Sequence, residues 1–131
     1  MGNRVRLLLD TNTLFWWFSG SDVLSQNARR AIASARSEVV VSVVSAWEIA
    51  IKTKSGKLDA QILVSDFGGF LDRAAFSVLK ISLDHVIRAG SLTEHHKDPF
   101  DRLLVAQAQT ESLTLVSNDK IFDQYGVRRV W

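Results

Sequence analysis

Short apolar runs alternate with more mixed segments along the chain. The runs RLLL at residues 6–9 and VVVS at 39–42 have no polar alternation, which is typical of parallel strands that are buried on both faces. The segments between such runs favour helices. The pattern predicts strands at residues 4–9, 38–42, 76–81, 113–116 and 127–130, and helices at 11–18, 25–35, 45–54, 63–75, 84–92, 99–111 and 120–124.

Helix boundaries are marked by capping residues and by the main chain breakers. Ser25 is expected to cap the second helix, and Asp98 the helix that opens with Pro99, the one proline of the chain. The adjacent Gly68 and Gly69 weaken the helix expected over residues 63–75.

Strands separated by helices indicate an α/β fold with a mostly parallel central sheet of about five strands. Because crossovers between parallel strands are right-handed, helices should cover both faces and give a three-layer α/β/α arrangement. The chain contains no repeat, low-complexity tract or linker, so residues 1–131 are expected to form a single domain.

Composition narrows the possible classes of protein. Apolar residues make up 47% of the 131 residues and charged residues 23%, as in ordinary globular proteins. No apolar run approaches the roughly 20 residues of a membrane span, and no secretory signal is evident, so we expect a cytoplasmic protein without a membrane partner. The absence of cysteine excludes disulfides and thiolate metal sites. A net charge of +2 permits a nucleic-acid partner without requiring one.

Four acidic residues fall where the carboxyl ends of the predicted strands meet the following helices. Asp10 ends the first strand, and Glu48 is expected in the first turn of the helix after the second strand. Asp101 lies in the first turn of the helix that Pro99 opens, and Asp119 follows the strand LTLV. In an open parallel sheet, binding sites form at this edge.

Each acid also has a purely structural explanation. Asp10, Asp98 and Asp119 suit helix or turn caps, and Ser45 with Glu48 fits the S-x-x-E capping box. Several carboxylates at one edge nevertheless repel each other, by about 4 kcal/mol per pair at ~4 Å and an effective dielectric of 20. A divalent cation reverses that sign, and all-oxygen ligands suit Mg²⁺ or Mn²⁺. Such a site would hydrolyse a phosphodiester through a metal-activated water.

Neighbouring polar residues allow more than one role. Thr11, Asn12, Ser117 and Asn118 are candidates to hydrogen-bond the ligating carboxylates or their waters, with turn formation as the alternative. Arg102 is a candidate contact for a phosphate or an acid, with a surface ion pair as the simpler interpretation. His95 and His96 precede Asp98 in a loop, where one of them is a candidate phosphate contact and exposed loop residues are the simpler interpretation.

The aromatic residues favour packing over base stacking. The sequence predicts that Trp16, Trp17 and Trp47 are packed against other apolar residues. Phe15, Trp16 and Phe18 also suit an interface for a partner helix, because aromatic side chains dominate such interfaces.

The segments LLLDTNTL, SAWEIAIK, HHKDPFDRLLVAQA and LVSND resemble, in this order, the PIN-domain family, and specifically VapC-type toxins of bacterial toxin–antitoxin pairs. The resemblance covers essentially the whole chain. It implies an Mg²⁺- or Mn²⁺-dependent endoribonuclease acting on transfer or ribosomal RNA, commonly dimeric and inhibited by a cognate VapB-type antitoxin. By the same resemblance, Asp10, Glu48 and Asp101 match the acidic metal site, and Asp119 is its fourth member. Asp98 matches an additional acid, which would contact the ligands rather than the metal.

Two other functions remain open from the residues. LLLDTNTLF approaches the D-x-D-x-T motif of haloacid-dehalogenase-like phosphatases, in which Asp10 would be the nucleophile, but Asn12 stands where the second acid belongs. A non-catalytic regulatory module would keep the acids for metal binding alone. The P-loop nucleotide-binding class is excluded, because no G-x-x-x-x-G-K-[ST] motif is present.

Overall fold

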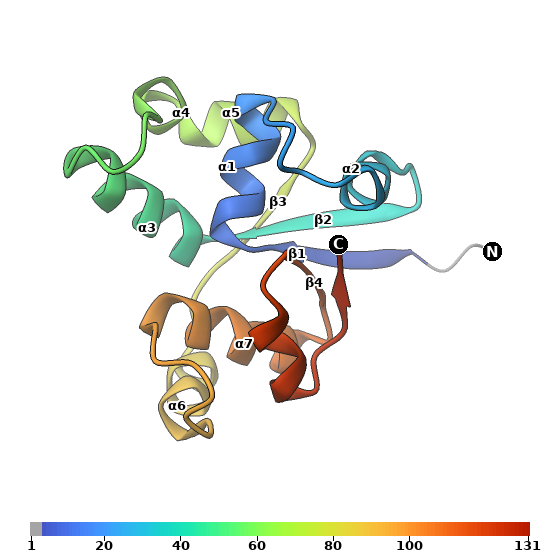
Figure 1. Ribbon diagram of the computed structural model, residues 1–131, viewed down its shortest axis with the longest axis vertical. Helices are drawn as coiled ribbons and strands as arrows, with labels where there is room; N and C mark the ends of the chain where they lie inside the picture. Colours follow the sequence, from blue (N-terminus) through green and yellow to red (C-terminus); the bar gives the residue numbers. More distant parts are fainter. Residues whose placement is uncertain (1–3) are drawn as a thin grey trace.

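The computed structural model describes residues 4–131 and contains a central sheet in the strand order β3-β2-β1-β4-β5 (Figure 1). The strands are β1 (Val5–Leu9), β2 (Ser37–Ser42), β3 (Ser77–Leu79), β4 (Thr114–Val116) and β5 (Arg129–Val130). All pairings are parallel, and Leu8 of β1 lies opposite Val40 of β2 and Leu115 of β4. The expected parallel sheet of about five strands is therefore confirmed.

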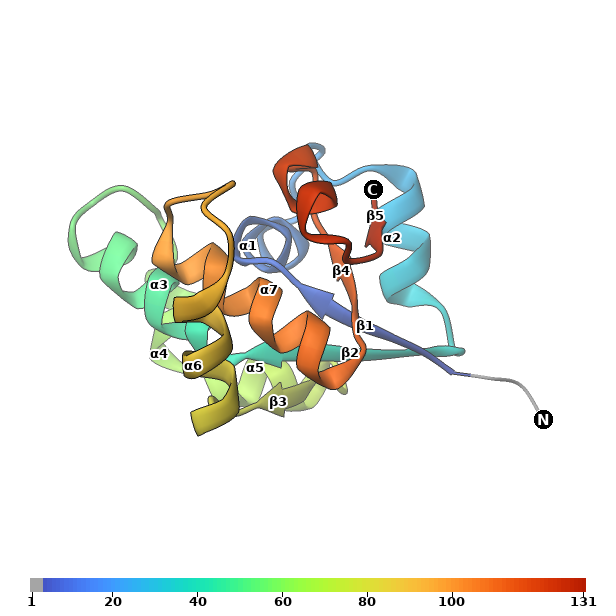
Figure 2. The ribbon, with the colours of Figure 1, turned by 90° about the horizontal axis from the view of Figure 1, so that it is seen from below.

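Helices cover both faces of this sheet (Figures 1 and 2). They are α1 (Thr11–Ser19), α2 (Gln26–Ala33), α3 (Val43–Lys54), α4 (Gln61–Ser65), α5 (Phe67–Arg73), α6 (Leu83–Ser91), α7 (Pro99–Glu111) and the 3₁₀ helix η1 (Lys120–Tyr125). None of the helices in the described part of the chain is long and apolar enough to cross a membrane.

Alternation along β1 divides the core into two clusters. Leu7 and Leu9 pack with α1, α2, α4 and α5, whereas Leu8 packs with α7 and η1 on the opposite face. Because side chains of a strand alternate between faces, the LLL run needs helices on both sides. The three-layer α/β/α arrangement is thus confirmed.

Several element boundaries differ from the sequence expectation. The helix expected over 63–75 is two helices, because Asp66 between them has a non-helical φ of −147°. A Cβ atom on Gly69 would collide with the Asp66 carboxylate, so glycine here leaves room for that side chain. The strands expected at 76–81 and 127–130 are shorter, at Ser77–Leu79 and Arg129–Val130. The caps at Ser25 and Asp98 are confirmed.

The predicted capping box at Ser45 and Glu48 is wrong. Helix α3 follows β2 directly, and its N-cap is Ser42, whose hydroxyl accepts the Val44 N–H at 3.1 Å. Ser45 therefore lies inside the helix, and Glu48 belongs to its second turn rather than its first. The β-branched pair Val43–Val44 continues the composition of the strand, which conceals this early start in the sequence.

Candidate metal centre

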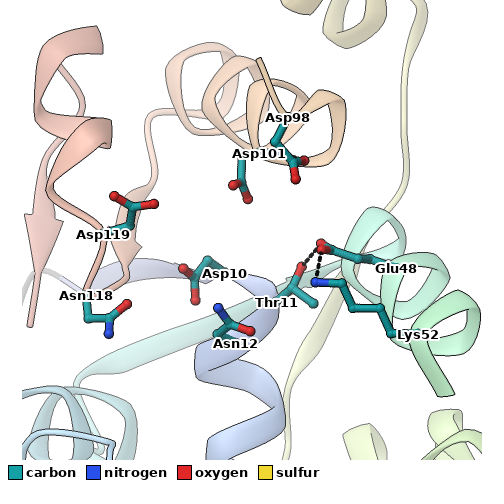
Figure 3. A pocket seen from close by; sticks show the side chains of 9 residues that line it. All are labelled: Asp10, Thr11, Asn12, Glu48, Lys52, Asp98, Asp101, Asn118 and Asp119. Carbon is teal, nitrogen blue, oxygen red and sulfur yellow. Dashed lines mark hydrogen bonds and ion pairs between the residues drawn. The ribbon is translucent and has the colours of Figure 1, made fainter. Parts of the chain in front are cut away.

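A pocket of about 420 Å³ opens at the carboxyl edge of the sheet, between α1, α3, α7 and the segment after β4 (Figure 3). Its lining is almost entirely polar and includes five carboxylates and one cation. The lining residues are Asp10, Thr11, Asn12, Glu48, Lys52, Asp98, Asp101, Asn118 and Asp119. Chain segments more than 100 positions apart in sequence thus bring all four predicted ligands to one pocket.

Asp10 and Asp119 enter the pocket from the ends of neighbouring strands. Asp10 Oδ1 accepts the Thr13 N–H at 2.8 Å, and Asp119 Oδ1 accepts the Ile121 N–H at 3.1 Å. Each carboxylate therefore caps the helix that follows it through one oxygen. The capping and ligand interpretations of these residues do not exclude each other.

Burial raises the pKa of Asp10 above its ordinary value. Only 6% of this residue is exposed, so its charged form is poorly hydrated. Hydrogen bonds from Ser117 and Thr13 oppose the rise in pKa, and the nearby charge of Asp119 adds to it. Asp10 is thus an acid whose ionised form would gain from a cation in the pocket.

The pKa of Asp101 is raised as well. Burial, followed by the charge of Asp98, raises the pKa of Asp101 from 3.8 to about 7. The neighbouring His96 opposes the rise in pKa, and the charges of Asp10 and Glu48 add to it. Asp98 caps α7 by accepting the Asp101 N–H at 3.1 Å, which fixes the two acids beside each other.

Glu48 is buried at the opposite side of the pocket, where both of its oxygens have partners. Thr11 Oγ1 donates to Glu48 Oε1 at 2.7 Å, and Lys52 Nζ lies 2.7 Å from Oε2. The hydrogen bond to Glu48 raises the pKa of Lys52, which keeps this lysine protonated. Lys52 is one turn further along α3, so the helix itself aligns the pair.

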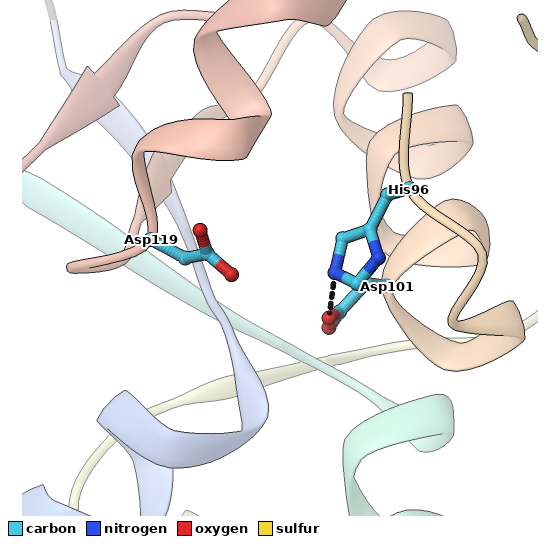
Figure 4. A group of neighbouring side chains, drawn as sticks. All are labelled: His96, Asp101 and Asp119. Atoms are coloured by element: carbon cyan, nitrogen blue, oxygen red, sulfur yellow. Dashed lines mark ion pairs between the residues drawn. The ribbon is translucent and has the colours of Figure 1, made fainter. Parts of the chain in front are cut away.

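His96 lies beside the pocket, which was the less favoured of the two positions that the sequence allowed for it. Its Nε2 lies 2.7 Å from Asp101 Oδ2. One ligand atom each from His96, Asp101 and Asp119 lie within 4.8 Å of one another, and Figure 4 shows the three side chains facing a common space. The His96 ring is oriented by the Asp98 N–H, which donates to Nδ1 at 3.3 Å. The doubled histidine before DPFD was the available signal.

Arg102 does not line the pocket, contrary to its suggested contact with a phosphate or an acid. Its guanidinium donates to the carbonyl oxygens of Ala89 and Leu92 at 2.9 and 2.8 Å. Longer bonds reach the carbonyls of Thr93 and His96 at 3.3 and 3.2 Å. Arg102 therefore holds the segment between α6 and α7 that carries His96.

The remaining predicted neighbours divide into two groups. Thr11, Asn12 and Asn118 line the pocket. Ser117 is fully buried, and its hydroxyl accepts the Asp119 N–H at 3.0 Å. Ser117 thus shapes the turn that presents Asp119, and its hydrogen bond also lowers the pKa of Asp10.

The donor set fits a hard divalent cation. Carboxylates at one pocket raise the pKa of each other, and a cation among them would stabilise their ionised forms. Oxygen ligands with at most one imidazole suit Mg²⁺ or Mn²⁺. Asp10, Asp101 and Asp119 point toward a common space, whereas Glu48 approaches from α3 and is shared with Lys52 (Figure 3).

The fold and pocket together define an α/β/α domain with an acidic centre at the carboxyl edge of a parallel sheet. The sequence model of the PIN domain family matches residues 7–127, so the chain belongs to the PIN-domain family. This match covers all the acids of the pocket. Comparison with curated protein sequences gives no match.

Solved structures of the same fold come from several bacteria. DNA-bound VapBC from Salmonella typhimurium aligns with a TM-score of 0.69 and 20% identity over 95% of this chain and 96% of that chain. VapBC2 from Rickettsia felis aligns with a TM-score of 0.71 and 19% identity over 95% of this chain and 97% of that chain. A toxin–antitoxin complex from Klebsiella pneumoniae aligns with a TM-score of 0.62 and 24% identity over 88% of this chain and 89% of that chain. At these identities, the similarity establishes the fold.

The Thr11–Glu48 hydrogen bond provides a test of how the pocket is held together. We expect Thr11→Val to weaken Mn²⁺ binding by about 10- to 100-fold, as loss of an outer partner of a metal ligand typically does. Thr11→Ser keeps the hydroxyl and should stay near wild type. Isothermal titration calorimetry measures both, and equal affinities for the two variants would contradict this role of Thr11.

Proposed function

We propose that the protein is a Mg²⁺- or Mn²⁺-dependent endoribonuclease that hydrolyses RNA phosphodiester bonds. The observation that carries this proposal is the pocket in which Asp10, Glu48, Asp101 and Asp119 meet at the sheet edge of a PIN domain. We assign these four acids to metal binding and catalysis. Asp98, Thr11, Asn12, Ser117 and Asn118 would support them, whereas Arg102 would act through the His96 segment.

The bound ion would supply a lowered pKa for a water molecule and charge neutralisation for the phosphate. The protein groups would do the rest. The ionised carboxylates would hold the ion and orient the attacking water. Lys52 places a positive charge in the pocket, where it can compensate the charge of a bound phosphate.

Cleavage of purified transfer and ribosomal RNA with Mg²⁺ or Mn²⁺ tests the proposal. We expect the wild type to cut RNA only with added metal, and Asp10→Asn to reduce the rate by at least about 100-fold, more than loss of an outer partner would. Asp72→Asn, which removes an exposed carboxylate on α5, is the matched control. Equal cleavage by wild type and Asp10→Asn would reject the assignment.

The two alternatives predict different results. A phosphatase would hydrolyse p-nitrophenyl phosphate and form a trappable aspartyl-phosphate at Asp10. A regulatory module would bind Mn²⁺ in calorimetry without cutting any RNA. Asn12 argues against the phosphatase, because it lines the pocket as an amide at the position of the phosphatase's general acid.

The toxin role is a second part of the proposal, and it follows from the neighbours. The Salmonella and Rickettsia neighbours are VapBC, and the Klebsiella neighbour is a toxin–antitoxin complex. A mainly apolar cavity of about 310 Å³ between α1, α4 and α5 suits a helix of a cognate VapB-type antitoxin. Phe15 and Phe18 line it, whereas Trp16 packs against Trp131 instead, with ring centroids 5.8 Å apart.

Growth and co-purification test the toxin role. We expect expression of the chain to arrest bacterial growth and co-expression of the neighbouring small reading frame to restore it. Ile62→Asp, which places a charge on the rim of the cavity, should abolish co-purification of the two proteins while leaving RNA cleavage intact. Rescue without any complex would contradict a direct antitoxin contact.

A homodimer is also proposed from the resemblance. Helix α6 exposes a row of apolar side chains that suits such an interface, because exposed apolar patches mark association sites. Leu83, Val86 and Ile87 are 75%, 43% and 64% exposed. Light scattering of the wild type and Ile87→Asp measures this association directly.

A further inference from the structure

The tryptophans of this chain occupy different environments. Trp16 and Trp17 are partly buried against the core, beside Trp131 and Phe76 respectively. Trp47 has an apolar neighbour, as the sequence predicted, but it is 58% exposed. Together with Ile51, which is 43% exposed, Trp47 leaves an apolar patch on the surface of α3.

Trp47 is nevertheless held in place. Its ring contacts that of Phe100 edge-to-face, with centroids 5.1 Å apart and an interplanar angle of 71°. Phe100 packs against the core cluster around Leu104 and Leu115. The contact joins α3 to the start of α7, so the exposed indole is supported by a residue that the core fixes.

The aromatic pair lies beside the candidate metal centre. Neither ring lines the pocket, but Trp47 immediately precedes Glu48 and Phe100 immediately precedes Asp101, so the contact between the two rings lies at the side of the pocket formed by α3 and α7. The same two helices therefore present both an aromatic surface and two of the acids. Lys52, which is one turn beyond Glu48, adds a positive charge to the same pocket.

Aromatic surface next to a phosphate-binding centre is the combination that single-stranded nucleic acids bind. We propose that Trp47, supported by Phe100, is a platform on which a base of single-stranded RNA stacks beside the phosphate being cleaved. The inference rests on the proposed ribonuclease function and adds to it the side chain that would position a base of the substrate. Because every base has a π-face, such a platform is tolerant of base identity.

A stacked base and a protein partner would cover different side chains of this surface. Ile51 is on the same face of α3 as Trp47, one turn away, and is 43% exposed. A protein interface over this face would bury both side chains. A single stacked base needs the indole alone, so Ile51→Ala is the matched control for Trp47→Ala.

Binding of two RNA probes tests the proposal. The probes are a fluorescein-labelled 12-nucleotide oligoadenylate and a 12-mer in which abasic ribose spacers replace every base. Fluorescence anisotropy with Mg²⁺ is measured in the Asp10→Asn background, which prevents cleavage. Trp47→Ala should weaken oligoadenylate binding by about 5- to 100-fold, as loss of a stacking residue does, and leave abasic binding unchanged. Trp47→Phe should retain most of the affinity, and Ile51→Ala all of it.

Three results would overturn the platform. One is unchanged oligoadenylate binding in Trp47→Ala, and another is an equal loss on both probes. The third is a change from dimer to monomer, in light scattering, for both Trp47→Ala and Ile51→Ala, which would assign this face to a protein partner. Circular dichroism melting verifies that each variant is folded. If the wild-type protein cleaves RNA and any of these three results is found, only the platform proposal fails. If the wild-type protein neither binds nor cleaves RNA, the ribonuclease proposal fails as well.

Discussion

Asp101→Asn is expected to stabilise the metal-free protein at pH 8 and at the same time to abolish most RNA cleavage. The pKa of Asp101 is raised from 3.8 to about 7 by burial and by neighbouring acids. Between these two values the folded protein holds a proton that the unfolded chain has lost, so stability falls as the pH rises through this range. Above pH 7 this loss of stability is complete. Replacing Asp101 by asparagine removes it, because the amide does not ionise.

The size of this effect follows from the pKa shift. At about 1.4 kcal/mol per pKa unit, a rise of roughly three units sets an upper limit of ~4 kcal/mol, and we expect a gain of about 1–3 kcal/mol. Thermal unfolding in EDTA at pH 5 and pH 8 measures it, with a larger gain at pH 8. Asp123→Asn is the control of opposite sign, because a hydrogen bond from Arg129 lowers the pKa of Asp123.

Loss of activity in the same variant separates function from stability. An outer partner of a metal ligand typically contributes ~10- to 100-fold, so loss of a ligand should cost more than about 100-fold in RNA cleavage. A variant that is more stable but inactive cannot owe its inactivity to unfolding. Destabilisation at pH 8, or cleavage at the wild-type rate, would contradict the role assigned to Asp101.

Metal affinity is expected to increase steeply with pH up to neutrality. Below about pH 7 Asp101 is protonated, and a metal must displace that proton in order to bind a carboxylate. The apparent affinity for Mn²⁺ should therefore rise about tenfold per pH unit from pH 5.5 to 7 and then level off. The raised pKa of Asp10 acts in the same direction.

Calorimetry in two buffers of different ionisation enthalpy measures the number of protons released with each ion. We expect about one proton per ion at pH 6 and close to none at pH 8, because ligands must be deprotonated to bind. Asp72→Asn should behave as the wild type. A constant affinity from pH 5.5 to 8, without proton release, would mean that the ion does not bind at Asp101.

The fold and the location of the pocket could be predicted because both depend on local rules. Strands buried on both faces leave continuous apolar runs, and side chains directly after parallel strands meet at one edge. Asp10 and Asp119 satisfy the second rule by position alone. Pro99 after Asp98 marks the start of α7 and so places Asp101 in its first turn.

What the sequence did not predict depends on contacts between distant segments. The position of His96 is set by a loop that Arg102 holds through backbone carbonyls, and no periodicity encodes such bonds. The exposure of Trp47 depends on the way α3 lies against α7, which local composition does not determine. Gly68 and Gly69 lie inside α5, so the glycines did not mark the break at Asp66, where the expected helix divides.

The central claim is that Asp10, Asp101, Asp119 and Glu48 converge on one divalent ion, and crystals soaked in Mn²⁺ test it most directly. Anomalous scattering locates manganese independently of the protein atoms. We predict a strong peak in the pocket, with oxygens of Asp10 and Asp101 at about 2.0–2.3 Å, a spacing usual for such ions. A pocket without anomalous signal at saturating Mn²⁺, or a peak bound only to residues outside it, would contradict the account.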